Sequence, residues 1–79
     1  MKIRVVRTHV GLHDAKALER TIKRDKNNET VVDAITRWLD EDEGQGELLT
    51  NFNYCKMLDV YAYSFKREQW IKILDLKCV

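Results

Sequence analysis

The most reactive side chains are two histidines, two cysteines and one serine, and they are widely spaced: His9, His13, Cys55, Cys78 and Ser64. A serine or cysteine nucleophile needs a base such as histidine within hydrogen-bonding distance. No histidine lies near Ser64 in the sequence, and a cysteine would meet a histidine only through folding. Free cysteines in small domains usually pack as small apolar side chains. We therefore predict that the protein is not an enzyme and has no catalytic residues.

A metal or cofactor site is not indicated either. His9 and His13 have the four-residue spacing of two ligands on one helical turn, but their surroundings predict the end of a strand followed by a loop. The cysteines form no Cys-x-x-Cys pair. Gly11, Gly44 and Gly46 do not form a glycine-rich phosphate-binding pattern. We predict no metal ligands and no cofactor.

Length and composition fit one small folded domain spanning residues 1–79. Apolar residues make up 44% of the chain and charged residues 34%, which is ordinary for a globular protein. No apolar run is long enough to cross a bilayer, and the N-terminal Met-Lys-Ile-Arg-Val-Val-Arg lacks the apolar region of a signal peptide. We expect a cytoplasmic protein with reduced cysteines and no membrane partner.

A strand and two amphipathic helices are predicted in the first half of the chain. Residues 2–9 alternate between apolar and charged side chains, which favours a strand. Residues 14–25 are predicted to be a helix because one apolar stripe runs along them at spacings of three and four, formed by Ala15, Leu18 and Ile22. Residues 31–42 are predicted to be a second helix, which begins with the capping-box pair Thr30 and Asp33.

Three strands are predicted in the second half. Gly44-Gln45-Gly46 would end the second helix, and residues 48–55 and 58–63 alternate like strands. Residues 66–69 suggest a hairpin turn, after which residues 70–78 fit either a strand or a helical stripe; their clean alternation favours the strand. The predicted order is therefore β-α-α-β-β-β, an α+β domain whose mostly antiparallel sheet carries two helices on one face.

Aromatic residues near the predicted hairpin are the candidates for a protein interface: Tyr61, Tyr63, Phe65 and Trp70. If the alternate residues of the strand, Leu58, Val60 and Ala62, face the helices, the aromatic side chains face outward. They would then suit contact with a protein or with nucleic-acid bases. In the opposite register the aromatic residues form the core, an interpretation favoured slightly because large side chains bury more area. The sequence leaves this register open.

The net charge of +1 conceals two halves of opposite sign. Residues 1–28 carry eight Lys and Arg against three Asp and Glu, a balance of +5, and the remaining residues carry six against ten, a balance of −4. A basic region can meet phosphate groups or an acidic protein surface, and an acidic region can meet a basic partner. Charge alone therefore leaves the class of partner open.

The N-terminal half has a recognisable arrangement. Residues Lys2 to Thr8 form a basic strand, Leu18 and Ile22 lie on the first predicted helix, and residues 27–39 supply the polar start and apolar stripe of the second. This arrangement resembles the ribbon-helix-helix family of DNA-binding regulators over about half the chain. Two chains of that family pair their ribbons, and the double strand enters the DNA major groove. The resemblance therefore implies a homodimer that binds DNA.

The resemblance also implies particular DNA contacts. Lys2, Arg4 and Thr8 would reach base edges, and Asn28 and Thr30 at the start of the second helix would hold a phosphate. The chain departs from the family in its long segment between ribbon and first helix and in its β-rich C-terminal half. The alternative is that the first strand is internal and pairs with the C-terminal strands of the same chain.

Taken together, these features predict a small non-enzymatic regulatory protein that binds a macromolecular partner, with a protein as the favoured partner. Small proteins of this kind are often inhibitors or modulators, frequently encoded by phages or other mobile elements. The alternative is a dimeric ribbon-helix-helix repressor or antitoxin that binds DNA.

Overall fold

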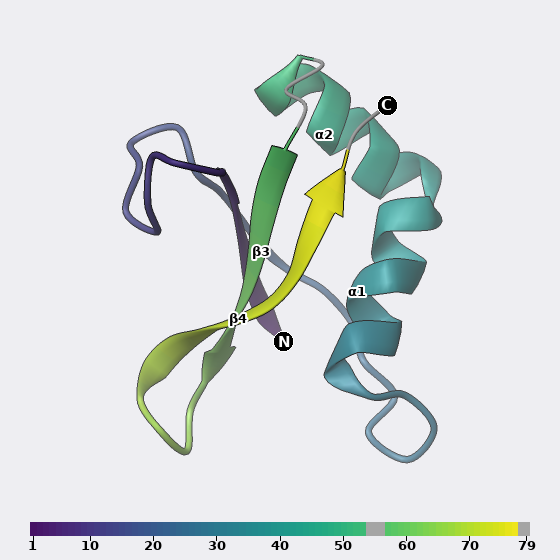
Figure 1. The fold of residues 1–79 in the computed structure, drawn as a ribbon. Helices are drawn as coiled ribbons and strands as arrows, with labels where there is room; N and C mark the ends of the chain where they lie inside the picture. The colour runs from purple at the N-terminus through teal and green to yellow at the C-terminus, as the bar shows by residue number, and fades with distance from the viewer. Residues whose placement is uncertain (54–56, 78–79) are drawn as a thin grey trace.

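The computed structural model describes residues 1–53 and 57–77 and has an α+β fold, as the sequence predicts. The elements, in chain order, are β1 (Lys2–Arg7), β2 (Leu18–Thr21), α1 (Val31–Asp40), α2 (Asp42–Phe52), β3 (Met57–Ser64) and β4 (Gln69–Lys77). The strands form one sheet in the order β2-β1-β3-β4, in which all neighbours are antiparallel. Both helices lie on the same side of this sheet (Figure 1).

The hydrophobic core lies between the sheet and the two helices. Ile3 and Val5 of β1 and Leu58 and Val60 of β3 are completely buried, because alternate residues of a strand point to the same face. The helices and the remaining strands complete the core with Leu18, Ile22, Ile35, Trp38, Leu39, Leu48, Phe52 and Ala62. The strand residues of this core lie on the helix-covered face of the sheet, whereas Val6 of β1 is completely buried on the opposite face.

The order of the elements is β-β-α-α-β-β, which corrects the predicted β-α-α-β-β-β. Residues 14–25 do not form a helix. Leu18 lies in β2 and pairs with Val5 of β1. Ile22 follows β2, and its N–H donates to the Met1 carbonyl at 2.8 Å. The four-residue spacing of Leu18 and Ile22 fits one face of a strand as well as one face of a helix. The strand prevails because it covers an edge of β1 that would otherwise lack hydrogen-bond partners.

The second correction concerns residues 42–52, which form α2 where the sequence predicts a glycine-rich helix end and then a strand. The helix α1 stops at Asp40, so Asp42 and Glu43 lie in the first turn of α2, where acidic side chains complement the helix dipole. Asn53 ends α2 in the left-handed conformation, with φ of 39°, which asparagine tolerates. The end of the predicted strand, at residues 54–55, lies outside the described residues.

Three local predictions are confirmed. The helix α1 begins with a complete capping box, in which Thr30 Oγ1 accepts the Asp33 N–H at 3.1 Å and the Asp33 carboxylate accepts the Thr30 N–H at 3.3 Å. The chain between β3 and β4 forms a hairpin. Residues 70–77 are part of a strand, while residue 78 lies outside the described residues.

Candidate functional site

The candidate site lies on the open face, which we define as the sheet face opposite the two helices. The burial of Leu58, Val60 and Ala62 settles the register of β3: these residues face the helices. Tyr61 and Tyr63 therefore point to the open face. The interpretation that the aromatic residues form the core is wrong, because the helices present apolar side chains large enough to fill the space above the smaller strand residues.

Three rings form an aromatic cluster on the open face, consisting of Tyr63, Phe65 and Trp70. The centroid of Tyr63 lies 5.0 Å from that of Phe65 and 5.3 Å from that of Trp70, both in edge-to-face contact. Phe65 is 70% exposed, whereas Tyr63 and Trp70 are half-buried. Edge-to-face pairs are worth about 0.5–1.5 kcal/mol beyond simple burial, so the cluster is a fixed apolar surface in contact with solvent.

Two cations of β1 lie over this cluster. The Arg4 guanidinium carbon is 5.1 Å from the Trp70 ring centroid, and Lys2 Nζ is 5.6 Å from that of Tyr63. Glu19 of β2 pairs with both cations, at 2.5 Å from Arg4 Nη2 and 3.3 Å from Lys2 Nζ. The hydrogen bond from Arg4, and then that from Lys2, lower the pKa of the Glu19 carboxyl. The two cations are therefore held in place by one carboxylate, which offsets one of their two positive charges.

The charges on the other half of the open face are also paired. Lys72 of β4 lies 2.6 Å from Asp75 and 3.6 Å from Asp59. Thr8 Oγ1 donates a hydrogen bond of 2.9 Å to Asp59. Tyr61 sits between the two sets of charges, because its neighbours across the strands are Arg4 and Lys72.

Replacement of Glu19 by Gln should make stability less dependent on pH. The folded-state pKa of Glu19 lies below its usual value of 4.5. The contribution of Glu19 to the free energy of unfolding is therefore present above about pH 4.5 and is lost as pH falls through the folded-state pKa. The difference in thermal midpoint between pH 7 and pH 3 should therefore be smaller in Glu19→Gln than in the wild type. The control is Glu68→Gln, at an exposed turn position without an ion pair among the described residues. An unchanged difference in Glu19→Gln would contradict the prediction.

The residues that the ribbon-helix-helix resemblance assigns to DNA all make contacts within their own chain. Lys2 and Arg4 share Glu19, and Thr8 is bonded to Asp59. Thr30 caps α1, and Asn28 Nδ2 donates to Asp25 Oδ2 at 2.7 Å. The strand β1 pairs with β2 on one edge and with β3 on the other, so it is internal to the sheet of its own chain.

In the described part of the chain, neither histidine belongs to a group of metal-binding side chains. Within residues 1–53 and 57–77, no group of three or more His, Cys, Asp or Glu is placed to hold a metal ion. His13 Nδ1 lies 3.5 Å from Arg4 Nη1, and His9 is exposed in the loop after β1. Cys55 and Cys78 lie outside the described residues. No described helix is long and apolar enough to cross a membrane.

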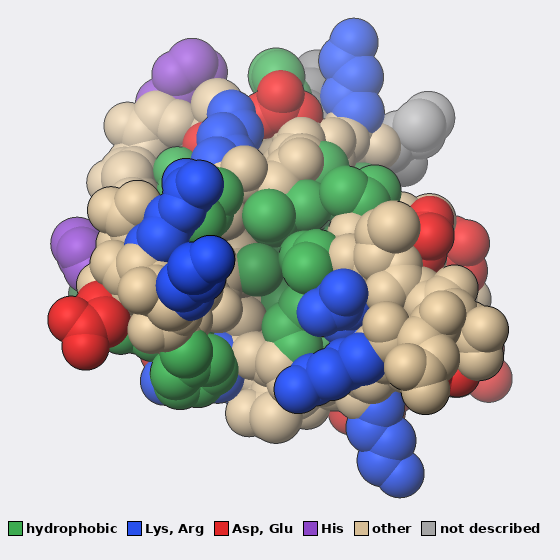
Figure 2. Space-filling view, turned by 90° about the horizontal axis from the view of Figure 1, so that it is seen from below, with side chains coloured by type: hydrophobic (Ala, Val, Ile, Leu, Met, Phe, Trp, Pro, Cys, Tyr) green, Lys and Arg blue, Asp and Glu red, His purple; other side chains and the backbone are tan. Residues whose placement is uncertain are grey.

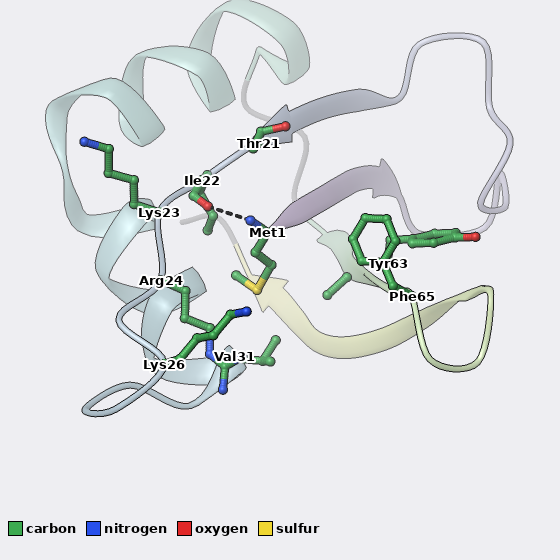
Figure 3. Close-up of a pocket in the computed structure, with 10 residues that line it drawn as sticks. Met1, Thr21, Ile22, Lys23, Arg24, Lys26, Val31, Tyr63 and Phe65 are labelled. Atoms are coloured by element: carbon green, nitrogen blue, oxygen red, sulfur yellow. Dashed lines mark hydrogen bonds between the residues drawn. The ribbon is translucent and has the colours of Figure 1, made fainter.

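A pocket of about 680 Å³ at the lower end of the sheet was not predicted from the sequence. Its walls come from the chain start, the segment after β2, the start of α1 and the end of β3, with the residues Met1, Thr21, Ile22, Lys23, Arg24, Lys26, Val31, Ala62, Tyr63 and Phe65 (Figure 3). We call it the basal pocket. In the sequence, the basic run Lys23-Arg24-Asp25-Lys26 was the one indication of this pocket. The incorrect prediction of a helix over residues 14–25 hid that indication.

Comparison of the chain with models of known protein families, with curated proteins and with solved structures gave no match.

Proposed function

We propose that the protein is a small regulatory protein that binds another protein through the open face of its sheet. The observation that carries this proposal is the aromatic cluster, in which three rings stay in contact with solvent and two cations lie over them. Aromatic residues and arginine are enriched at the centres of protein interfaces, where they supply most of the binding energy. Action as an inhibitor or modulator is consistent with such a surface on so small a domain.

Charge pairing on the open face favours a protein over a nucleic acid. Binding of nucleic acid depends on cations that neutralise phosphates and release counterions. Lys2 and Arg4 already share Glu19, and Lys72 is already paired with Asp59 and Asp75. A surface of paired charges around apolar rings matches the polar rim and apolar centre of a protein interface.

The test uses the tagged protein to capture partners from a lysate of cells that carry its gene, followed by quantitative mass spectrometry. Trp70→Ala should weaken binding of the captured partner about thirtyfold, the usual effect of losing about 2 kcal/mol at a central residue. Phe65→Ala should also weaken it, and it leaves the core unchanged because Phe65 is 70% exposed. Lys66→Ala, at the neighbouring exposed position, is the matched control and should bind like the wild type.

Equal capture by the wild type and Trp70→Ala would contradict the proposal. The DNA-binding alternative is tested with the same proteins by light scattering over a hundredfold dilution and by titration of duplex DNA at two salt concentrations. A stable dimer whose DNA affinity falls steeply with salt and depends on Arg4 would replace the proposal.

A further inference from the structure

The basal pocket has an aliphatic floor and a basic rim. The side chains of Met1, Ile22, Val31 and Ala62 form the floor, and they belong to or pack against the core. Figure 2 shows hydrophobic side chains gathered at the centre of this end of the molecule, with Lys and Arg side chains on both sides. Figure 3 shows Arg24 and Lys26 on the side of the pocket where Val31 lies, whereas Lys23 extends away from Met1. Arg24 and Lys26 are therefore the cations that a ligand in the pocket would meet.

These two cations are not ion-paired with a carboxylate among the described residues. Neither Arg24 nor Lys26 forms an ion pair within the described part of the chain, and the lining contains no acidic residue. The nearby Glu29 carboxylate lies 2.8 Å from Arg37. Asp25 accepts hydrogen bonds from the Asn27 N–H at 3.0 Å and from Asn28 Nδ2 at 2.7 Å.

Both acidic neighbours are thus engaged by other residues, Asp25 by Asn27 and Asn28 of its own loop and Glu29 by Arg37 of α1. The pKa of Asp25 is lowered chiefly by the Asn28 side chain, and that of Glu29 chiefly by Arg37, with a smaller contribution from the charge of Arg24. Arg24 Nε donates to the Glu29 carbonyl at 3.1 Å, which fixes the guanidinium without neutralising it. The basal pocket is therefore an apolar cavity with positive charge at its mouth, in contrast to the paired charges of the open face.

We propose that the basal pocket binds an acidic peptide segment of the protein partner, with one large apolar side chain of that segment on the aliphatic floor and flanking carboxylates at Arg24 and Lys26. This inference rests on the proposed function, because Tyr63 and Phe65 belong both to the pocket lining and to the aromatic cluster. A partner seated on the open face would reach the pocket without a break in the contact surface.

The lining favours a peptide over the other anionic ligands. Stacking of nucleic-acid bases requires flat aromatic platforms, but the floor is aliphatic, and the rings of Tyr63 and Phe65 come from the cluster side. A lipid carboxylate places one charge beside a long chain, whereas Arg24 and Lys26 are two separate cations that match successive acidic side chains. The volume of about 680 Å³ lies within the range of about 300–1,000 Å³ typical of specific binding pockets.

The test is a titration of the ¹⁵N-labelled full chain followed by NMR. The probe is a blocked hexapeptide with one central phenylalanine flanked by glutamates. Amide shifts should concentrate at residues 22–26, Val31 and Phe65, with a Kd of about 1 mM or tighter.

Lys26→Glu should weaken binding about tenfold, since a rim attraction becomes a repulsion, and the double variant Arg24→Gln with Lys26→Glu should abolish it. Lys77→Glu is the matched control, because Lys77 is exposed at the end of β4 and is not a lining residue. Lys26 is exposed and makes no hydrogen bond within the described residues, so its variant should fold normally even if the double variant does not.

Peptides in which alanine replaces the phenylalanine, or glutamine replaces the glutamates, should lose binding. The inference is overturned if the acidic peptide does not bind, if Lys26→Glu binds it as well as the wild type does, or if dodecanoate or a single-stranded DNA dodecamer occupies the pocket in preference to the peptide. Failure of the peptide to bind would leave the proposed function standing, because capture of the partner through Trp70 is measured independently. Conversely, peptide binding without any effect of Trp70→Ala on partner capture would leave the pocket assigned and the open-face interface refuted.

Discussion

Replacement of Gly44 by Ala should destabilise the protein by about 3 kcal/mol or more, a large part of the roughly 5–10 kcal/mol expected for a domain of this size. A Cβ atom at position 44 would lie 2.0 Å from the carbonyl oxygen of Trp38 and 3.1 Å from the Cα of Leu39. Both are backbone atoms of α1 and cannot rotate away. The two helices would have to separate where α1 ends and α2 begins, which would expose part of the core beneath them.

The control for this prediction is Gly46→Ala, two residues further along the same helix. A Cβ atom at position 46 meets no other atom within 4 Å, and alanine is a better helix former than glycine by about 0.5–1 kcal/mol. The two substitutions should therefore change the free energy of unfolding in opposite directions in urea denaturation followed by circular dichroism. Similar effects at both positions would show that the close approach of α2 to Trp38 does not occur in solution.

Replacement of Trp38 by Ala should cost about 3–5 kcal/mol, the usual range for removing a large aromatic side chain from a core. Trp38 is only 3% exposed and lies in the main core cluster between α1 and the sheet. The variant should lose a large part of the stability of the domain, which calorimetry would show as a much lower thermal midpoint.

The same substitution at Trp70 provides the comparison. Trp70 is half-buried on the open face, where its ring contacts Tyr63 edge-to-face and lies beneath the cations of Arg4 and Lys2. Loss of these contacts should cost about 1 kcal/mol, while the main effect should appear in partner binding. Equal destabilisation by Trp38→Ala and Trp70→Ala would mean that the open face is covered by further core packing and is not a free surface.

Several features were determined by the sequence alone because they depend on neighbouring residues. The capping box of α1 needs only Thr30 and Asp33 three positions apart. The alternation along β1 and along the β3–β4 hairpin identifies strands because the two faces of a sheet meet different environments. The same alternation placed Tyr63 and Phe65 of the aromatic cluster on one side of the chain, because they are two positions apart.

Other features were decided only by the tertiary structure, because they depend on residues that are distant in the chain. The spacing of Leu18 and Ile22 fits a helix or a strand, and the free edge of β1 selects the strand. Gly44 of α2 lies so close to the Trp38 backbone that a Cβ atom would clash with it, a contact that no local glycine pattern reveals.

The tertiary structure also decided which face of β3 is buried, and therefore where the candidate site lies. Nothing in the alternation of β3 states which face the helices will cover, and the burial of Leu58 and Val60 depends on Ile35 and Trp38. The pairing of Arg4 with Glu19 joins residues fifteen positions apart, and the basal pocket joins Met1 to Phe65. A sequence specifies local periodicity directly. Ion pairs and cavities depend on side chains from several segments, and they arise only when folding brings those segments together.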